Sequence, residues 1–254
     1  MYIAVLDETI LLVIKFRIGG NLRFLSHAQT LRVFQRACVR AGVKIRYSEG
    51  FNPHPRLSLP LPRSVGVEAD DDLLCIWTQD AGPASSLDTE GFRAGLSEHL
   101  PEGLQLLSVT VANGKASFQP CSATYVLQVK PEYLDEGLKV RIERLLASDN
   151  LNIQRKISSG QSTIDNRQST IKDVDIRGYL SSIVLEDKCI VVECRISPAG
   201  SIRVEEILGL LELDQEKLAA PIRRTCIQWQ QAEAGGRKTL GQKTDDGKRR
   251  TEGK

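Results

Sequence analysis

Residues 11–47 read LLVIKFRIGGNLRFLSHAQTLRVFQRACVRAGVKIRY, and this stretch decides the fold class. Its first part, Leu11 to Ile18, is rich in branched side chains and predicts a strand. Ser26 and Gln29 have the spacing of a capping box, which opens a predicted helix that ends at Gly42. Four apolar residues at helical spacing give this helix one buried face: Leu31, Phe34, Cys38 and Ala41. Residues 43–47 then predict a second strand.

The rest of the chain continues this pattern. Residues 71–78 predict a strand, 88–100 a helix and 104–112 a strand, which completes the β-α-β-β-α-β order of a ferredoxin-like unit. Residues 113–122 contain Gly, Pro and small polar residues and predict a linker, after which the order recurs with one strand's worth of extra material. We therefore expect an α+β protein with two tandem ferredoxin-like domains, 10–113 and 122–231, and a disordered tail, 232–254.

Composition excludes several classes of protein. The 254 residues are 41% hydrophobic and 26% charged, with a net charge of +2, which is typical of a globular protein. Since no apolar run approaches the roughly 18 residues of a membrane span, and the apolar start has no basic leader, we expect a cytoplasmic protein. The six cysteines form no CxxC pair and no cluster beside His, so we expect structural thiols and no metal site.

Charge is strongly segregated within the first predicted domain. Residues 10–65 contain ten basic residues and one acid, a net charge of +9, whereas residues 66–114 have nine acids and one Arg, a net charge of −8. On the predicted helix, Arg32, Arg36 and Arg40 lie opposite the apolar face, and no acid occurs between residues 26 and 48. Such a face favours phosphate binding. An internal ion-pair network with Asp70 to Asp72 and a plain solvated face remain alternatives.

The loop at 47–56, YSEGFNPHPR, is too specific in composition to be a spacer. Pro53 and Pro55 fix their own backbone and force Asn52 and His54 toward extended conformations. In the LSLPLP segment that follows, alternate prolines remove backbone donors, so it cannot be a central strand. The excursion from residue 48 to residue 70 is long, and loops of this length are usually functional.

Residues 22–68, LRFLSHAQTLRVFQRACVRAGVKIRYSEGFNPHPRLSLPLPRSVGVE, resemble the signature region of the bacterial radical-SAM-linked domain of unknown function. The most specific features are FLSH and GFNPHP at this separation. Members occur alone or as the C-terminal part of B12-binding radical SAM proteins, and some are encoded near an RNA-processing nuclease. The resemblance therefore implies a radical SAM partner or a link to RNA. Gln29 stands where the family usually has an acid, so the resemblance implies no role for an acid at this position.

Individual side chains have competing interpretations. His27 and His54, with Lys15 or Tyr47, could form a metal-independent RNA-cleaving site, or they could simply order the helix start and the loop. Tyr47 and Phe51 could stack on unpaired bases or pin the loop to the sheet. Four further arginines are candidate phosphate ligands, two beside the proline-rich segment and two beside Gly19-Gly20: Arg56 and Arg63, and Arg17 and Arg23.

These observations favour an accessory module that binds RNA or presents a substrate to radical SAM, RNA-processing or ribosome-related machinery, without catalysis of its own. It would bind RNA or a ribonucleoprotein through the helix arginines and the 47–56 loop. The radical SAM cluster needs cysteines at CxxxCxxC spacing, which this chain lacks, and no cofactor motif occurs. The alternatives are a ribonuclease or RNA-modifying enzyme that uses His27 or His54, and a protein-binding adaptor without nucleic acid.

Overall fold

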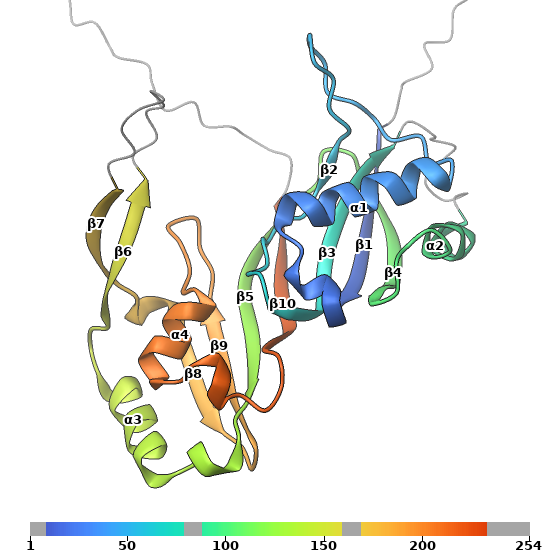
Figure 1. Ribbon diagram of the computed structural model, residues 1–254. Coiled ribbons are helices and arrows are strands. Elements are labelled where there is room, and N and C mark those ends of the chain that lie inside the picture. The colour runs from blue at the N-terminus through green and yellow to red at the C-terminus, as the bar shows by residue number, and fades with distance from the viewer. Residues whose placement is uncertain (1–8, 79–87, 159–168, 233–254) are drawn as a thin grey trace, which may run out of the picture.

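The computed structural model describes residues 9–78, 88–158 and 169–232, in which four α-helices pack against a mixed eight-stranded sheet (Figure 1). The helices are α1 (His27–Arg40), α2 (Thr89–Ser97), α3 (Glu136–Ala147) and α4 (Val204–Leu211), with short 3-10 helices η1 (Gly20–Phe24), η3 (Pro131–Tyr133), η4 (Arg177–Tyr179) and η5 (Gln215–Lys217). The strands are β1 (Ile10–Ile18), β2 (Leu57–Ser58), β3 (Glu68–Thr78), β4 (Leu104–Asn113), β5 (Ser117–Gln128), β6 (Asn152–Ser158), β7 (Ser169–Asp175), β8 (Leu180–Leu185), β9 (Cys189–Arg195) and β10 (Arg223–Ala232). Among these described helices, none combines the length and apolarity that crossing a membrane requires.

Both halves of the chain contribute to one continuous sheet. Its order is β4-β1-β3-β10-β5-β9-β8. The short β2 pairs with the second half of β3, on the edge that faces away from β1. All pairings are antiparallel except β3–β10, a short parallel contact in which Glu68 and Ala69 lie opposite Arg223 and Arg224. The β6–β7 hairpin stands apart as a two-stranded sheet and accounts for the extra strand material expected in the second half. The last described strand, β10, therefore joins the two halves, because it pairs with β3 on one side and with β5 on the other.

The local signals of α1 are confirmed. The Ser26 hydroxyl accepts a hydrogen bond from the Gln29 backbone N–H (3.3 Å), and the Gln29 side chain accepts one from the Ser26 N–H (2.8 Å), which completes the capping box. Gly42 follows the helix at φ +69°, a conformation in which glycine ends helices without strain. Phe34 and Cys38 are fully buried, and the Phe34 ring packs edge-on against Phe16 of β1.

Each half has its own core on the helix-covered face of the sheet. In the first half, α1 and α2 pack on the side chains of β1, β3 and β4 (Figure 1). In the second half, α3 and α4 pack on β5, β8 and β9. A smaller third cluster lies on the opposite face of β1 and β3, where Leu11, Val13 and Leu73 are covered by the ends of β5 and β10. This arrangement leaves the outer surface of α1 exposed.

A buried ion pair connects the two halves where β10 meets β3. Arg224 of β10 is 1% exposed, and its Nε and Nη2 atoms donate to Asp72 of β3 at 3.1 and 2.7 Å. The same guanidinium donates to the carbonyl of Pro62 at 3.0 Å, and the buried Tyr125 side chain of β5 lies close enough to interact with it electrostatically. Burial raises the pKa of Tyr125, so its hydroxyl stays neutral beside the arginine. The pair thus links both halves with the proline-rich segment.

Two predicted boundaries are wrong. Residues 43–47 form no strand: the segment makes only isolated bridges, Ile45 to Thr78 and Tyr47 to Pro55. The predicted linker at 113–122 belongs largely to β5, and Pro120 is tolerated there because the register with β10 shifts between Gln228 and Trp229, beside it. The predicted tail lies outside the described residues, apart from position 232, which ends β10.

The cysteines allow a direct test of the burial pattern. Burial raises the pKa of Cys38 and Cys194 to about 12 and that of Cys75 to about 11, because a thiolate is poorly solvated in an apolar core. Since the thiolate is the nucleophile, we expect iodoacetamide at pH 8 to leave these three unmodified in the folded protein. The exposed Cys226 and the partly exposed Cys121 should react. Peptide mass spectrometry before and after unfolding measures this, and modification of Cys38 or Cys194 in the folded protein would contradict the described core.

Candidate nucleic-acid interface

The outer face of α1 carries three exposed arginines in a row. Arg32, Arg36 and Arg40 lie one turn apart, opposite the buried Phe34 and Cys38, and the helix contains no acid. In the described parts of the chain, none of the three forms an ion pair. Like charges four residues apart destabilise a helix by a few tenths of a kcal/mol per pair, so this face is electrostatically unfavourable without an anion.

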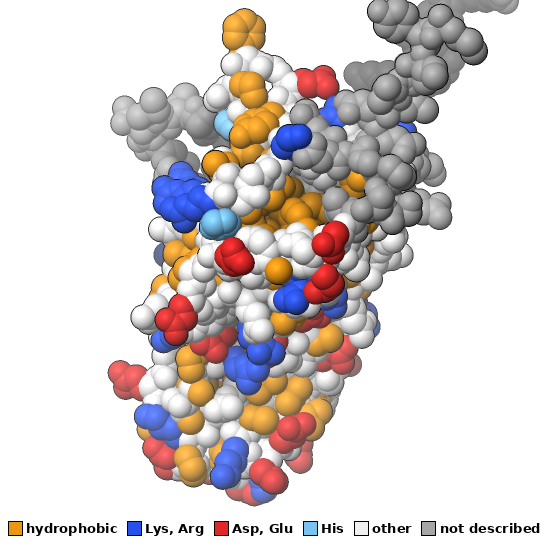
Figure 2. All heavy atoms as spheres, turned by 90° about the vertical axis from the view of Figure 1, so that its right-hand side faces the viewer, with side chains coloured by type: hydrophobic (Ala, Val, Ile, Leu, Met, Phe, Trp, Pro, Cys, Tyr) orange, Lys and Arg blue, Asp and Glu red, His pale blue; other side chains and the backbone are white. Residues whose placement is uncertain are grey.

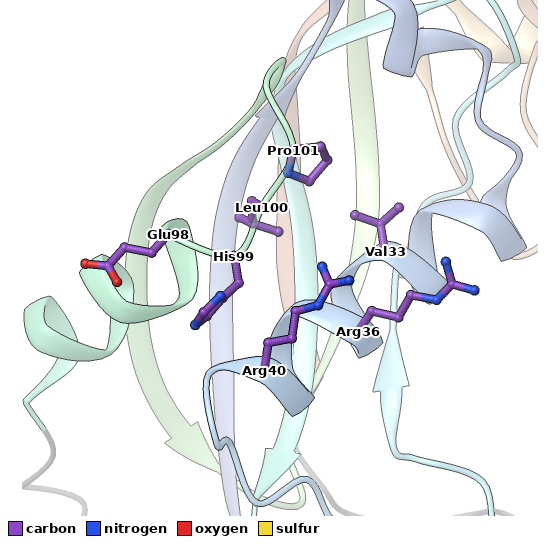
Figure 3. A pocket seen from close by; sticks show the side chains of 7 residues that line it. All are labelled: Val33, Arg36, Arg40, Glu98, His99, Leu100 and Pro101. Atoms are coloured by element: carbon purple, nitrogen blue, oxygen red, sulfur yellow. The ribbon is translucent and has the colours of Figure 1, made fainter.

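A groove of about 410 Å³ separates α1 from the turn after α2 (Figure 3). In Figure 3 the Arg40 side chain points into this groove, His99 lies across from it, and the Glu98 carboxylate points away. The full lining combines these groups with apolar side chains: Val33, Arg36, Arg40, Glu98, His99, Leu100 and Pro101. The groove therefore offers cationic groups above an apolar floor, a combination that suits an anionic ligand with a flat apolar part.

A second, open hollow of about 430 Å³ lies along the other side of the same arginines. It is lined by Arg32, Gln35, Arg36, Val39 and Arg40. Arg36 and Arg40 therefore border both hollows, and Figure 2 shows Lys and Arg side chains gathered on one flank of the molecule next to a histidine. We call this surface, made of Arg32, Arg36, Arg40 and His99, the basic face.

His99 is the member of the basic face that sequence reasoning missed. In the sequence it stands at the end of a predicted helix, where a cation is favourable whatever its neighbours are. Its position across the groove from Arg40 depends on how α2 packs on β4, close to α1. No local pattern in the sequence contains that information.

The cations of β1 behave differently from those of α1. Lys15 pairs with Asp71 at 3.0 Å, and Arg17 pairs with Asp70 at 3.3 Å across the β1–β3 ladder. Asp70 also pairs with Arg223 of β10. The ion-pair alternative considered for the basic segment thus describes its strand cations, whereas the helix arginines lie outside that network. Arg17 is therefore not part of the basic face.

Three other candidate arginines are engaged in the fold. Arg63 donates to the backbone carbonyls of Arg23 (2.8 Å) and Val67, and burial lowers the pKa of its guanidinium. Arg23 donates to the Gly20 carbonyl at 2.8 Å and lies 4.3 Å from the Phe24 ring centroid. Arg56 lies over the Trp77 ring at 5.0 Å. These contacts position the residues around the proline-rich segment and leave the basic face to α1 and His99.

Residues 47–56 form a narrow arm that rises beyond the end of the sheet (Figure 1). Its two sides are joined by hydrogen bonds from the Ser48 N–H to the His54 carbonyl (2.8 Å) and from the His54 N–H to the Ser48 hydroxyl (2.9 Å). At its base, the Arg56 N–H donates to the Arg46 carbonyl at 2.7 Å. The arm is thus an ordered ribbon, held by prolines and cross-bonds.

The side chains of the arm point into solvent. Phe51, at the tip, is 111% exposed, so the interpretation that its ring pins the loop to the sheet is wrong. Tyr47 is 48% exposed, and Asn52 and His54 are exposed as well. Figure 2 shows hydrophobic side chains extending up this projection to its tip.

The two candidate catalytic histidines lie in different surroundings. The buried Nδ1 of His27 has no hydrogen-bond partner among the described residues, and it lines a cavity of about 10 Å³ with Arg63 and Asp72, large enough for about one water molecule. His54 is exposed on the arm. No described cavity includes both side chains. Across the described ranges, no group of three His, Cys, Asp or Glu side chains is arranged to hold a metal ion.

Comparison with known proteins places these features in a family. Residues 12–201 match the model of DUF2344, described as an uncharacterized protein conserved in bacteria. This region includes α1, the arm and most of the second half, and the description names no reaction, ligand or partner. No curated protein matches the chain. Because the match covers most of the 254 residues, the chain belongs to the bacterial family DUF2344.

Proposed function

We propose that this protein is an RNA-binding module that holds RNA along α1 and presents it to a partner. The observation that carries the proposal is the basic face: three exposed arginines on one helix, without ion pairs in the described chain, with a hollow on each side. Phosphate is the anion that this face fits best, because a guanidinium can donate two parallel hydrogen bonds to its oxygens.

The contrast with β1 supports this interpretation. The same segment of sequence supplies Lys15 and Arg17, and the fold provides an aspartate for each of them. It provides none for Arg32, Arg36 or Arg40 in the described residues. An external polyanion would remove the repulsion among these three side chains and would make many contacts along the helix at once. The resemblance to proteins encoded near an RNA-processing nuclease makes RNA the first polyanion to test.

We also propose that the two halves of the sheet are two ferredoxin-like domains in tandem. In the second half the order β10-β5-β9-β8, with α3 and α4 between strands, is that of a ferredoxin-like unit into which the β6–β7 hairpin is inserted. In the first half, β4-β1-β3 and the short β2 have the corresponding order. Tandem ferredoxin-like domains would form a rigid platform for the basic face. We further propose that the protein is cytoplasmic and that its partner is a B12-binding radical SAM protein.

Binding without catalysis is the version that the geometry favours. His27 faces a cavity too small for a nucleotide, and the described polar contacts of His54 are backbone contacts within the arm. A ribonuclease that uses both histidines would need to bring them to one phosphate. The alternative of a protein adaptor predicts no affinity for RNA, so a measurement of RNA binding distinguishes the two.

The salt dependence of RNA binding tests the proposal. Each phosphate contact to a single strand contributes a slope of about −0.7 to log K against log salt. With three arginines engaged we expect a slope of about −2 for a fluorescein-labelled 20-nucleotide RNA, measured by anisotropy between about 50 and 300 mM KCl. The RNA should remain intact in EDTA during the measurement. Absence of binding at about 50 mM KCl, or an affinity that does not change with salt, would contradict the proposal.

A further inference from the structure

The tip of the arm carries an aromatic side chain that the fold does not use. Phe51 is fully exposed, whereas Phe16 and Phe34 are buried in the first core. An isolated apolar side chain on a surface is ordinary. A phenyl ring at the end of a projecting, ordered ribbon is a different case, because folding gives it no contact and the arm holds it away from the body of the protein. The ring is therefore free to contact a ligand.

The arm keeps this ring in place. Gly50, at φ +129°, makes the bend that turns the chain at the tip, and Pro53 and Pro55 fix the backbone of the returning side. The cross-bonds between Ser48 and His54 close the ribbon just below the tip. Phe51 is therefore presented with little freedom of the main chain, so that binding would cost little ordering entropy.

The surroundings of the tip indicate what kind of surface it meets. Tyr47 and His54, both exposed, give the arm two more flat rings. Helix α1, with its basic face, ends a short turn before the arm begins, and the arm rises beyond it in Figure 1. A partner held by α1 would thus offer phosphates to the helix and a flat apolar surface to the arm. Nucleic acid has both, and its bases expose their faces only where they are unpaired.

We infer that Phe51 stacks on an unpaired base, and that the ligand of this surface is single-stranded RNA and not a duplex. This inference rests on the proposed function, since α1 must hold the phosphates that deliver the base. It assigns different roles in binding to α1 and to the arm. The arginines supply affinity for any polyanion, and the arm selects strands whose bases are accessible.

The test compares Phe51→Ala and Phe51→Trp with the unchanged protein on three probes: a single-stranded 12-mer of uridine, the same oligomer with abasic ribose at every position, and a 12-base-pair RNA duplex. Loss of one base–aromatic stack weakens binding roughly 5- to 150-fold. We expect Phe51→Ala to weaken binding of the 12-mer by roughly this factor and to leave the abasic oligomer and the duplex unchanged. Phe51→Trp should bind the 12-mer normally, and its fluorescence should be quenched on binding.

Tyr133→Ala is the matched control, since it removes an aromatic ring that is 38% exposed in the second half. It should leave all three affinities unchanged. Because the Phe51 ring makes no contact in the fold, its removal should not alter thermal unfolding. If the unchanged protein binds RNA but Phe51→Ala binds the 12-mer equally well, the inference about the arm fails and the proposed function stands. If the unchanged protein binds none of the probes, both fail.

Discussion

Asp72→Ala is expected to lower the free energy of unfolding by about 3–5 kcal/mol. The substitution leaves the Arg224 guanidinium charged and 1% exposed, with only the carbonyls of Leu61 and Pro62 to accept its hydrogen bonds. A buried charge without a counter-ion is far more costly than the loss of one hydrogen bond. Urea unfolding followed by circular dichroism measures the difference.

Two comparisons separate this effect from a general sensitivity of the region. Arg223→Ala removes the neighbouring arginine, which is 41% exposed and pairs with Asp70 near the surface, and should cost about 1 kcal/mol or less. The double variant Asp72→Leu with Arg224→Met replaces the buried pair by apolar side chains and should recover most of the lost stability. A loss below 1 kcal/mol for Asp72→Ala, or a double variant no better than the single one, would contradict the description of the junction.

The junction of β3 and β10 is the part of the fold that the sequence does not predict. Hydrophobic periodicity and the capping box identified β1 and α1 well, because those signals are local. The pairing of β3 with β10 joins residues more than a hundred positions apart, and it consists of two register pairs and one buried ion pair. Nothing near Arg224 in the sequence distinguishes it from the more exposed Arg223. Long-range burial decides which arginine is structural.

The two misjudged boundaries have local explanations. Residues 43–47 have the composition of a strand, but Arg46 bonds to Trp77 at the end of β3 and the chain then leaves the sheet to form the arm, so a regular ladder never develops. The segment before Ser122 contains Pro120 and small residues that are typical of a linker. It is a strand nonetheless, because a register shift beside Pro120 removes the need for its missing N–H.

For the candidate site, the sequence predicted the helix arginines but could not separate them from the strand cations. Both groups come from one segment with a net charge of +9. The separation follows from geometry, since Lys15 and Arg17 lie on β1 within ion-pair distance of Asp71 and Asp70 on the neighbouring strand β3, whereas α1 turns its arginines away from that sheet. His99 completes the face only through the packing of α2.

Charge reversal on the basic face is expected to remove most of the RNA affinity. In Arg36→Glu with Arg40→Glu, two phosphate contacts are lost from the helix turns that border both hollows. Two contacts to a single strand are worth roughly 60-fold in affinity at about 50 mM salt, and the repulsion from the new carboxylates adds to this loss. The salt slope should become shallower by about 1.4, because it counts the phosphates contacted.

The matched control reverses two exposed arginines in the second half, Arg144 of α3 and Arg195 of β9, and so changes the net charge by the same amount. If RNA is held by α1, the control should keep its slope and nearly all of its affinity. Equal losses in the two double variants would mean that RNA responds only to overall charge, and the basic face would lose its assigned role. Both variants should retain the circular dichroism spectrum of the unchanged protein, since all four side chains are exposed. The distinguishing quantity is therefore the difference in slope between variants of identical charge, which only a localised set of phosphate contacts produces.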